Sequence, residues 1–449
     1  MSSPFTAPNP MRDTVLRFSE RIVLATLIAG LLFPPCVFGA EAPLTLARAM
    51  HLALERSRQL AAQDHAVAAS RDMAVAAGQL SDPVLKFGVD NLPVNGGDRF
   101  SPGKDFMTMR RVGVMQEITG ADKRRLRSSR FEREAEKSLA EKELTAAAIE
   151  RDTALAWLDR YYAGAMAALI AEQGAQARLE IQAAEGAYRG GRGSQAELFV
   201  ARSALAASDA HTSEFQRRIR NTTTMLARWI GVAADLPLAG KPVTDTLRLD
   251  PATLDTQLAH HPQITVLAKQ EEIAQSEAQL ALANKKSDWS VEVAFQQRGP
   301  AYSNMVSVGV SIPLQWDQKN RQDRELSSKL ALVEQAKAVR EEKLREHIAE
   351  TRTMLNEWEN GRERNARYQH ELIPLAQERT SAVLTAYRGA KASLADVLAA
   401  RRNDIDVRIQ ALQLETETAR LWAQLNFLFP DEIENGHASM RMNRIINEE

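Results

Sequence analysis

The feature that most constrains the fold is an uninterrupted helical stretch from about residue 121 to residue 187. It contains no proline, and apolar side chains between residues 155 and 169 recur at alternating intervals of three and four, the spacing of heptad packing. At about 1.5 Å per residue such a stretch forms a rod about 100 Å long, whereas helices of globular proteins average about 11–12 residues. The sequence therefore predicts a coiled coil or a tube of helices.

The sequence contains two copies of this arrangement. The segment "YRGGRGSQAELFVAR" from Tyr188 returns as "YRGAKASLADVLAAR" from Tyr387, an offset of 387 − 188 = 199 residues. Three other segments recur at similar offsets: 259 − 55 = 204, 287 − 81 = 206 and 308 − 112 = 196. A period this long indicates a duplicated unit, since solenoid repeats span about 20–50 residues.

Each half is predicted to contain a helix, two strands, a long helix, the repeated motif and a final helix. The first half, 41–230, has a helix near 44–80, strands near 83–92 and 107–117, and a hairpin tip at 188–194. The second half, 253–429, has strands near 288–298 and 304–314, a long helix near 319–386 and a tip at 387–393. We expect Pro374 to kink this last long helix. A linker, 231–252, joins the halves, and a tail, 430–449, follows them.

The repeated motif is predicted to form the turn of a helical hairpin in each half. Glycines interrupt the rod, and a serine followed three residues later by an acid is the pattern of a capping box. A capped turn explains the glycines and serines but not the tyrosine–arginine pair before each turn, so we hypothesise that the tips contact a partner. The residues concerned are Tyr188, Arg189, Gly190, Gly191, Ser194 and Glu197 in the first half, and Tyr387, Arg388, Gly389, Ser393 and Asp396 in the second.

Residues 1–40 are typical of an export signal. Arginines precede the apolar run 22–33, which is too short to span a bilayer. We expect cleavage near Gly39 or Ala40, and no run of 18 apolar residues follows it. Cys36 is the only cysteine, so its removal leaves a mature protein without disulfides or thiolates. Lipid attachment at Cys36 is an alternative, although the preceding residues are not the small ones that such a site needs.

The four predicted strands alternate between apolar and polar side chains. This alternation is typical of transmembrane β-strands of about ten residues, and it also fits a half-buried sheet in a soluble protein. The export signal and the long helices favour the membrane interpretation. The side chains expected to face lipid are Trp289, Val291, Val293, Phe295, Val306, Val308, Val310 and Ile312.

Four strands are too few to close a sheet on itself. A sheet inside a membrane must close, because every backbone polar group needs a partner there. Several copies are therefore required, and three copies provide 3 × 4 = 12 strands. The sequence predicts a homotrimer in which the copies share one barrel.

This combination resembles the TolC family of outer-membrane efflux proteins, over essentially the whole chain after the export signal. The resemblance rests on the duplication, the helix–strand–strand–helix order and the two Y-R-G-x-[RK]-x-S tips. The segment "GVDNLPVNGGDRFSPGKDFMTMRRVGVMQEITGADKRR" is further similar to the CzcC- or CusC-like branch, associated with heavy-metal cation export. The resemblance implies a mainly α fold with a membrane β-barrel: a trimeric, twelve-stranded barrel in the outer membrane of a Gram-negative bacterium, on a twelve-helix periplasmic tunnel.

The resemblance also implies partners and a gate. Such proteins dock on a periplasmic adaptor (membrane fusion protein) and an inner-membrane pump, here of the resistance-nodulation-division (RND) type. The adaptor is expected to hold the hairpin tips, while the linker and the tail form an equatorial band around the tunnel. Asp396 holds the first acidic position of the family's aperture, whereas Ala399 and Ala392 replace a second acid and a basic residue. A ring of three Asp396 carboxylates would attract cations; helix capping alone is the alternative role.

Other functions find little support in the sequence. A net charge of −1 argues against a nucleic-acid binder, and no phosphate loop or hydrolase motif occurs. We therefore predict no catalytic residue, no cofactor and no resident metal. The pair His260–His261 and the methionines Met107, Met109 and Met115 remain weaker candidates for metal ligands. Met109 and Met115 lie on the same side of the second strand as the charged residues Arg111 and Glu117. The sequence therefore does not decide which side of this strand faces lipid.

Two alternative functions stay open. One is an outer-membrane duct for drugs, organic solutes or secreted polypeptide. The other belongs to a different class, a periplasmic coiled-coil adaptor or scaffold, which would leave the strands outside the membrane.

Overall fold

The structure is a computed structural model that describes residues 42–191 and 193–430. The chain divides into two units, Met1–Pro43 and Leu44–Glu449, and all helices and strands named below belong to the second. The predicted export signal, with Cys36, and the tail from residue 431 lie outside the described residues.

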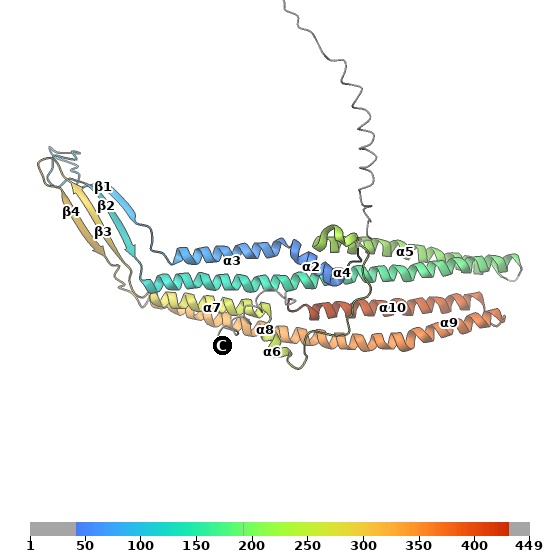
Figure 1. Cartoon of the computed structure of the whole chain (residues 1–449). Coiled ribbons are helices and arrows are strands. Elements are labelled where there is room, and N and C mark those ends of the chain that lie inside the picture. Colours follow the sequence, from blue (N-terminus) through green and yellow to red (C-terminus); the bar gives the residue numbers. More distant parts are fainter. Residues whose placement is uncertain (1–41, 192, 431–449) are drawn as a thin grey trace, which may run out of the picture. The chain divides into compact units, whose positions relative to one another are not determined.

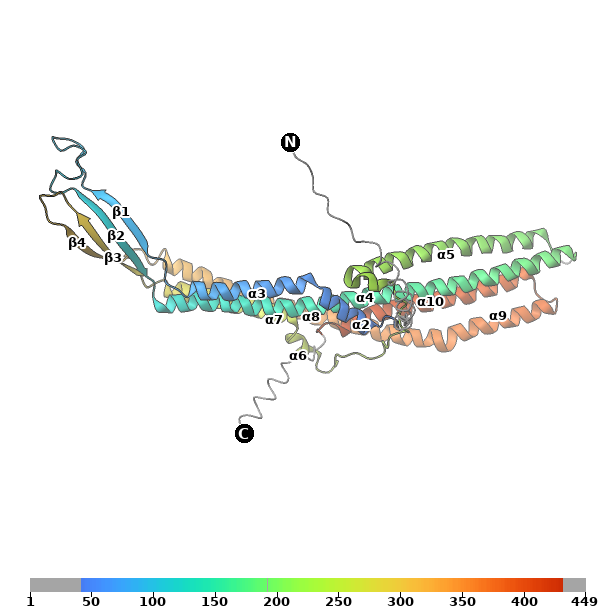
Figure 2. The same cartoon turned by 45° about the horizontal axis from the view of Figure 1, so that its top comes forward.

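The predicted long helix of the first half is confirmed as α4, Ala121–Arg189, which has 69 residues. The helix α3, Arg58–Ala77, packs along its beginning and α5, Gln195–Ile230, along its end (Figures 1 and 2). The prediction of one helix over 44–80 is wrong. It is broken into α2, Leu46–Arg56, and α3, because the Ser57 hydroxyl caps the second helix and accepts from the backbone N–H of Leu60 at 3.2 Å.

The second half repeats this arrangement with one interruption. Its long helix consists of α8, Gln322–Arg367, a π-helical turn, Tyr368–Leu372, and α9, Ile373–Arg388. The π turn ends at Leu372, two positions before Pro374. The ring nitrogen of Pro374 cannot donate a backbone hydrogen bond, so the helix is interrupted where the proline was expected to disturb it.

Among the described residues, no helix is long and apolar enough to cross a membrane. Three further helices, α6, α7 and α10, complete the second half. The helix α7 packs between α4 and α8, while α10 packs on α4, α8 and α9 (Figure 1). Their bounds are Leu254–Ala259 for α6, Pro262–Ala283 for α7 and Leu394–Asn426 for α10.

The strands form one four-stranded antiparallel sheet with the order β1-β2-β3-β4 (Figure 1). The pairing joins the two halves, because β2 of the first half lies beside β3 of the second. Within one chain β1 and β4 each have one unpaired edge. The bounds are Val84–Asp90 for β1, Met109–Ile118 for β2, Trp289–Gln297 for β3 and Met305–Ser311 for β4.

The register sorts the side chains of the sheet onto two faces. Directly opposed residues share a face, and one row across the sheet runs Lys86, Gly113, Ala294 and Ser307. This face, here called the polar face, also carries Arg111, Glu117, Met109 and Met115, which settles the facing of the second strand. The opposite face, here called the apolar face, has the polar residues Arg110 and Gln116 of β2 but is otherwise largely apolar. Its apolar residues include Leu85, Phe87, Val89, Val112, Val114, Trp289, Val291, Val293, Phe295, Val306, Val308 and Val310.

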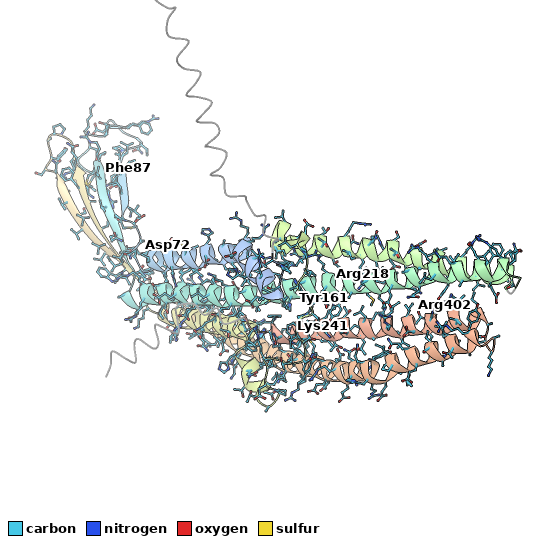
Figure 3. All side chains as sticks on the ribbon, turned by 45° about the vertical axis from the view of Figure 1, so that its right-hand side comes forward. Asp72, Phe87, Tyr161, Arg218, Lys241 and Arg402 are labelled. Atoms are coloured by element: carbon cyan, nitrogen blue, oxygen red, sulfur yellow. The ribbon has the colours of Figure 1, made fainter. Side chains whose placement is uncertain are left out.

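The main core lies in the middle of the helices, where the two halves and the linker meet. Trp157 of α4, Trp358 of α8 and Trp422 of α10 are buried in one cluster. The linker is tied to this cluster: the Trp422 Nε1–H donates to the carbonyl of Thr246 at 2.8 Å. Lys241 of the linker (labelled in Figure 3) lies 2.7 Å from the Glu415 carboxylate of α10. The core therefore holds the helices of both halves and the linker together near the middle of α4.

Candidate functional site

The first hairpin tip is a tight turn between α4 and α5. The backbone N–H of Gly193 donates to the carbonyl of Ala187 at 3.1 Å. A side chain at residue 193 would place its Cβ 3.0 Å from the Ala187 Cβ, and Gly191 has a φ of 68°. Glycine is therefore favoured at 191 by backbone conformation and at 193 by space.

The second tip, between α9 and α10, forms a similar turn with fewer glycines. Ala390, which corresponds to Gly191 by the repeat offset (191 + 199 = 390), takes up a left-handed φ of 55° although it carries a Cβ. Its N–H donates to the carbonyl of Tyr387 at 3.0 Å, and Lys391 N–H donates to Ala386 at 2.8 Å. The sequence assigned this turn to Gly389 alone and missed the strained alanine.

Both predicted capping boxes are confirmed. In the first, the Ser194 hydroxyl accepts from the Glu197 N–H at 3.2 Å, and the Glu197 carboxylate accepts from the Ser194 N–H at 2.9 Å. In the second, Ser393 and Asp396 make the same two bonds at 3.2 and 2.9 Å, and the Ser393 hydroxyl also donates to Asp396 at 2.7 Å. Each tip therefore holds the start of its returning helix.

Asp396 is both a cap and an exposed charge. The hydroxyl and the backbone N–H of Ser393 hold the pKa of the Asp396 carboxyl below its usual value, because both donate to its charged form. Both bonds go to Oδ2, while the side chain lies on the exposed surface. Capping therefore keeps this carboxylate ionised, and the aperture ring remains a prediction for the trimer.

The structure brings the two tips of one chain together and makes their tyrosines unequal. A small apolar cluster contains Ala184 of α4, Ala201 of α5 and Leu394 of α10, with Tyr387 packed against it. Tyr188, the counterpart of Tyr387, is 48% exposed. Arg189 and Arg388 are exposed beside the turns. Tyr387 of the second tip is therefore packed against the cluster, whereas Tyr188 of the first tip is exposed.

Three ion pairs that sequence reasoning missed join α10 to α4. The pairs run antiparallel along the two helices at 2.6, 2.9 and 2.6 Å, and their partners are 221 to 261 residues apart in the chain. No local pattern marks such distant partners, so only the packing of α10 on α4 reveals them. The pairs are Arg401–Glu180, Arg408–Glu172 and Arg420–Asp159.

The two faces of the sheet differ in the way that the alternation predicts. On the polar face, Glu292 accepts from Lys86 at 2.9 Å and also pairs with Arg111. On the apolar face, Phe87 is 80% exposed (Figure 3) and Val308 is 70% exposed. The other side chains assigned to lipid are exposed or, in the case of Val291, half-buried; Ile312, just beyond β4, is 56% exposed. A single chain therefore presents an uncovered apolar surface opposite a paired, charged one.

Among the candidate metal ligands, His261 has a structural role. His261 caps α7, since its Nδ1 accepts from the Gln263 N–H at 3.2 Å, and its ring packs on that of His347 with centroids 4.2 Å apart. Burial, with a smaller contribution from His347, lowers the pKa of His261 to about 4. Over residues 42–191 and 193–430, no group of three or more His, Cys, Asp or Glu side chains is arranged to hold a metal ion.

Comparison with known proteins identifies the fold. No protein-family model matches the sequence, and no curated protein matches it. The structure is similar to the outer-membrane channel OprN (16% identity, 86% of this chain and 90% of that chain, TM-score 0.72) and to the outer membrane protein VceC from Vibrio cholerae (18%, 85% and 95%, 0.71). It is equally similar to CusC, a protein that forms a transmembrane channel (15%, 86% and 92%, 0.72). At these identities the likeness establishes the fold, which is that of the outer-membrane channel proteins.

Proposed function

We propose that the chain is the outer-membrane channel of a tripartite, RND-type efflux system, and that it works as a homotrimer. In this proposal it lies in the outer membrane of a Gram-negative bacterium, with a large periplasmic portion. The chain itself performs no catalysis and needs no cofactor; the pump supplies the energy. The observation that carries the proposal is the four-stranded sheet with two open edges and one exposed apolar face.

The open edges support assembly from several copies. An edge strand with unpaired N–H and C=O groups invites another strand, and inside a membrane these groups must be paired. Since β1 and β4 of the sheet run antiparallel to each other, β4 of one copy can pair with β1 of the next in the antiparallel sense. An even number of strands in each copy lets the ring close with this alternation throughout.

The two faces support a lipid-embedded ring with a polar interior. A large exposed apolar surface on a soluble protein marks a contact with a partner or a membrane. Because the same sheet carries ion pairs on its other face, closure that turns Glu292, Arg111 and Lys86 inward would place charges in water and valines in lipid. A soluble scaffold would need another protein to cover the apolar face.

The tips support docking on an adaptor at the far end of the helices from the sheet. The sheet precedes α4 in the chain and the first tip follows it, so the two features are separated by the length of α4, about 100 Å. We propose that the exposed tip residues Arg189, Gly190, Gly191, Arg388 and Gly389 meet the periplasmic adaptor. The capping residues Ser194, Glu197 and Ser393 hold the shape of that surface.

Heavy-metal cations are the proposed cargo. The support is the resemblance of the segment around β1 and β2 to the heavy-metal branch, together with the ionised Asp396, which would attract cations at the aperture. CusC is no more similar to this chain than OprN is, with TM-scores of 0.72 for both, so the fold comparison does not favour one cargo.

Deletion of the gene tests the role and the cargo together. The deletion strain is grown on Cu, Ag, Zn, Co and Cd salts beside a panel of drugs, with complementation by the wild-type gene. Sensitivity to metals alone supports the proposed cargo, and sensitivity to drugs alone assigns the duct to organic solutes. No change under any condition counts against an efflux role.

Extraction from membranes separates the channel from the scaffold alternative. A channel resists salt and is released only by detergent, because its apolar face lies in lipid. Release of the protein by a salt wash would overturn the proposal in favour of a periplasmic adaptor or scaffold.

A further inference from the structure

Two polar side chains interrupt the apolar face, and both belong to β2. The Gln116 amide is held by the chain itself, since it donates to two backbone carbonyls at 2.7 and 2.9 Å. Arg110 is exposed, and over residues 42–191 and 193–430 no hydrogen bond or ion pair holds its guanidinium. Its neighbours in the same row, Val89 and Gln297, carry no charge. Arg110 is therefore a cation on the apolar face that its own chain does not neutralise.

Closure of the ring leaves the surroundings of Arg110 unchanged. The strand β2 lies between β1 and β3 of the same chain, whereas a second copy can pair only with the open edges of β1 and β4. The two strands beside Arg110 therefore come from its own chain in the proposed homotrimer as well. A partner for this arginine is thus expected from the lipid side of the sheet and not from another copy.

The position of Arg110 along β2 sets its depth in the membrane. The strand ends at Ile118, directly before α4, so Arg110 lies near the end of the sheet that is remote from the helices (Figure 1). Over 118 − 110 = 8 residues, a rise of about 3.4 Å per residue and a tilt of about 40° give about 21 Å across the membrane. The apolar band of such a sheet is about 25 Å tall. If the helices are periplasmic, Arg110 lies near the outer edge of this band, and its long side chain reaches the lipid headgroups.

The loop between β1 and β2 brings a second cation to the same end of the sheet. Gly103 of this loop lies so close to Gly299, between β3 and β4, that a Cβ at residue 299 would collide with the Gly103 carbonyl. The exposed Lys104 follows Gly103 directly, so the contact between the loops places it at the outer end of the strands. The neighbouring acid, Asp105, accepts from the backbone N–H of Met107 at 2.7 Å.

We infer that Arg110, with Lys104, binds a phosphate of lipid A, the phosphorylated glycolipid of the outer leaflet of a Gram-negative outer membrane. The inference rests on the proposed function, which places the sheet in this membrane. A guanidinium donates two parallel hydrogen bonds to phosphate oxygens. The next row toward the middle of the membrane contains Phe87 and Phe295, whose exposed rings can contact the acyl chains below the phosphate. Cations above aromatic rings thus match a phosphorylated headgroup above its acyl chains.

The charge of the headgroup favours lipid A over an ordinary phospholipid. The phosphates of lipid A are monoesters, and a phosphate monoester carries about −1.5 to −2 charges at pH 7. The phosphodiester of a phospholipid carries a single charge. The unneutralised Arg110 should therefore discriminate between the two lipids.

Binding of lipid A to the full-length, detergent-extracted trimer tests this inference. The protein is washed free of native lipopolysaccharide, titrated with lipid A and analysed by native mass spectrometry, which counts the lipids on each trimer. We expect one lipid A per copy in the wild type and at least about tenfold weaker binding in Arg110→Gln. Arg110→Lys keeps the charge without the fork of donors and should be intermediate. Arg402→Gln removes the same charge at the exposed far end of α10 and should bind as the wild type does.

Two further lipids test which headgroup is recognised. Lipid A without its phosphates should not bind, and phosphatidylglycerol should bind at least about tenfold more weakly than lipid A. Equal affinity for phosphatidylglycerol would overturn the inference, because the surface would then recognise any anionic lipid. If Arg110→Gln does not assemble, Lys104→Gln, outside the strands, gives the same test with an expected loss of about threefold.

The outcomes separate this inference from the proposed function. If the particle is a trimer released only by detergent, and Arg110→Gln binds lipid A as tightly as the wild type, the inference is wrong and the channel proposal stands. If the protein is a monomer released by a salt wash, the channel proposal is wrong and the inference falls with it.

Discussion

The guanidinium of Arg401 on α10 lies 2.6 Å from the carboxylate of Glu180 on α4, and the Glu180 residue is only 9% exposed. Burial raises the pKa of Glu180 while Arg401 opposes this rise. The pair holds the second tip against the first at the level where the apolar cluster lies. It is the member of the three α4–α10 ion pairs that lies nearest to the tips.

Replacing Arg401 by methionine should destabilise the tips, because the buried Glu180 then has no cationic partner. Removing one partner of a buried pair costs about 3–5 kcal/mol, and the 27% exposure of the Arg401 side chain reduces this to about 2 kcal/mol. Thermal unfolding of the detergent-extracted protein measures the loss. Arg402→Gln, at the exposed neighbouring position, is the control (Figure 3). An unchanged melting temperature in Arg401→Met would show that the pair does not hold α10 on α4.

Acid should weaken the packing of α7 on α8, where the buried rings of His261 and His347 meet. Burial lowers the pKa of His261 from 6.5 to about 4, and burial also lowers the pKa of His347. As the pH falls from 6.5 toward 4, the unfolded chain binds a proton that the folded chain does not, so the free energy of unfolding falls. For His261 alone the loss is on the order of 3 kcal/mol.

Melting temperatures between pH 7 and pH 4 measure this effect. The charged groups that act on His347 are Glu350, Glu346 and Lys343, and Arg151 also acts on His261. His347→Phe removes one titrating group and should flatten the profile, whereas the exposed His260→Gln should leave it unchanged. A profile that is equally steep in His347→Phe would rule out this histidine as a source of the acid sensitivity.

A charge on the apolar face should prevent membrane assembly, and the same charge on the polar face should not. Val308 and Ser307 are neighbours on β4, but Ser307 lies in the row of Ala294 and Val308 lies on the opposite face. Val308→Arg should cost about 2–4 kcal/mol near the middle of the bilayer and abolish heat-modifiable trimers in outer-membrane fractions. Ser307→Arg should retain them. If both variants assemble equally, the apolar face does not lie in lipid.

The two tips should respond in opposite ways to the exchange of glycine and alanine. Ala390 and Gly191 both have positive φ values, of 55° and 68°. Ala390→Gly relieves the left-handed strain and Gly191→Ala introduces it, each by about 1 kcal/mol. Hydrogen exchange of the tip amides should therefore become slower in Ala390→Gly and faster in Gly191→Ala. A change of the same sign in both variants would contradict the equivalence of the two turns.

The regular elements follow from local patterns in the sequence. The length of α4 follows from a stretch without proline, and each hairpin turn follows from glycine, serine and an acid at fixed spacing. The alternation in β3 and β4 placed the valines on one face before any register was known. These features depend on neighbours in the chain, so the sequence is sufficient to predict them.

Where the structure differs from what the sequence predicts, the cause is either one residue or a contact between residues that are far apart in the chain. One hydroxyl, that of Ser57, ends an alanine-rich helix, and the helix accommodates Pro374 with a π turn. The pair Arg401–Glu180 spans 221 residues, and the rings of His261 and His347 meet across 347 − 261 = 86 residues. Such contacts depend on how α10 and α8 pack, which no periodicity specifies. The unequal exposure of Tyr188 and Tyr387 arises in the same way.

Images of single particles of the detergent-extracted protein test the central claim most directly. Three copies that share one closed sheet, above helices that surround an open lumen, are the predicted result. A monomer, or helices packed around a solid apolar centre without a lumen, would contradict the account.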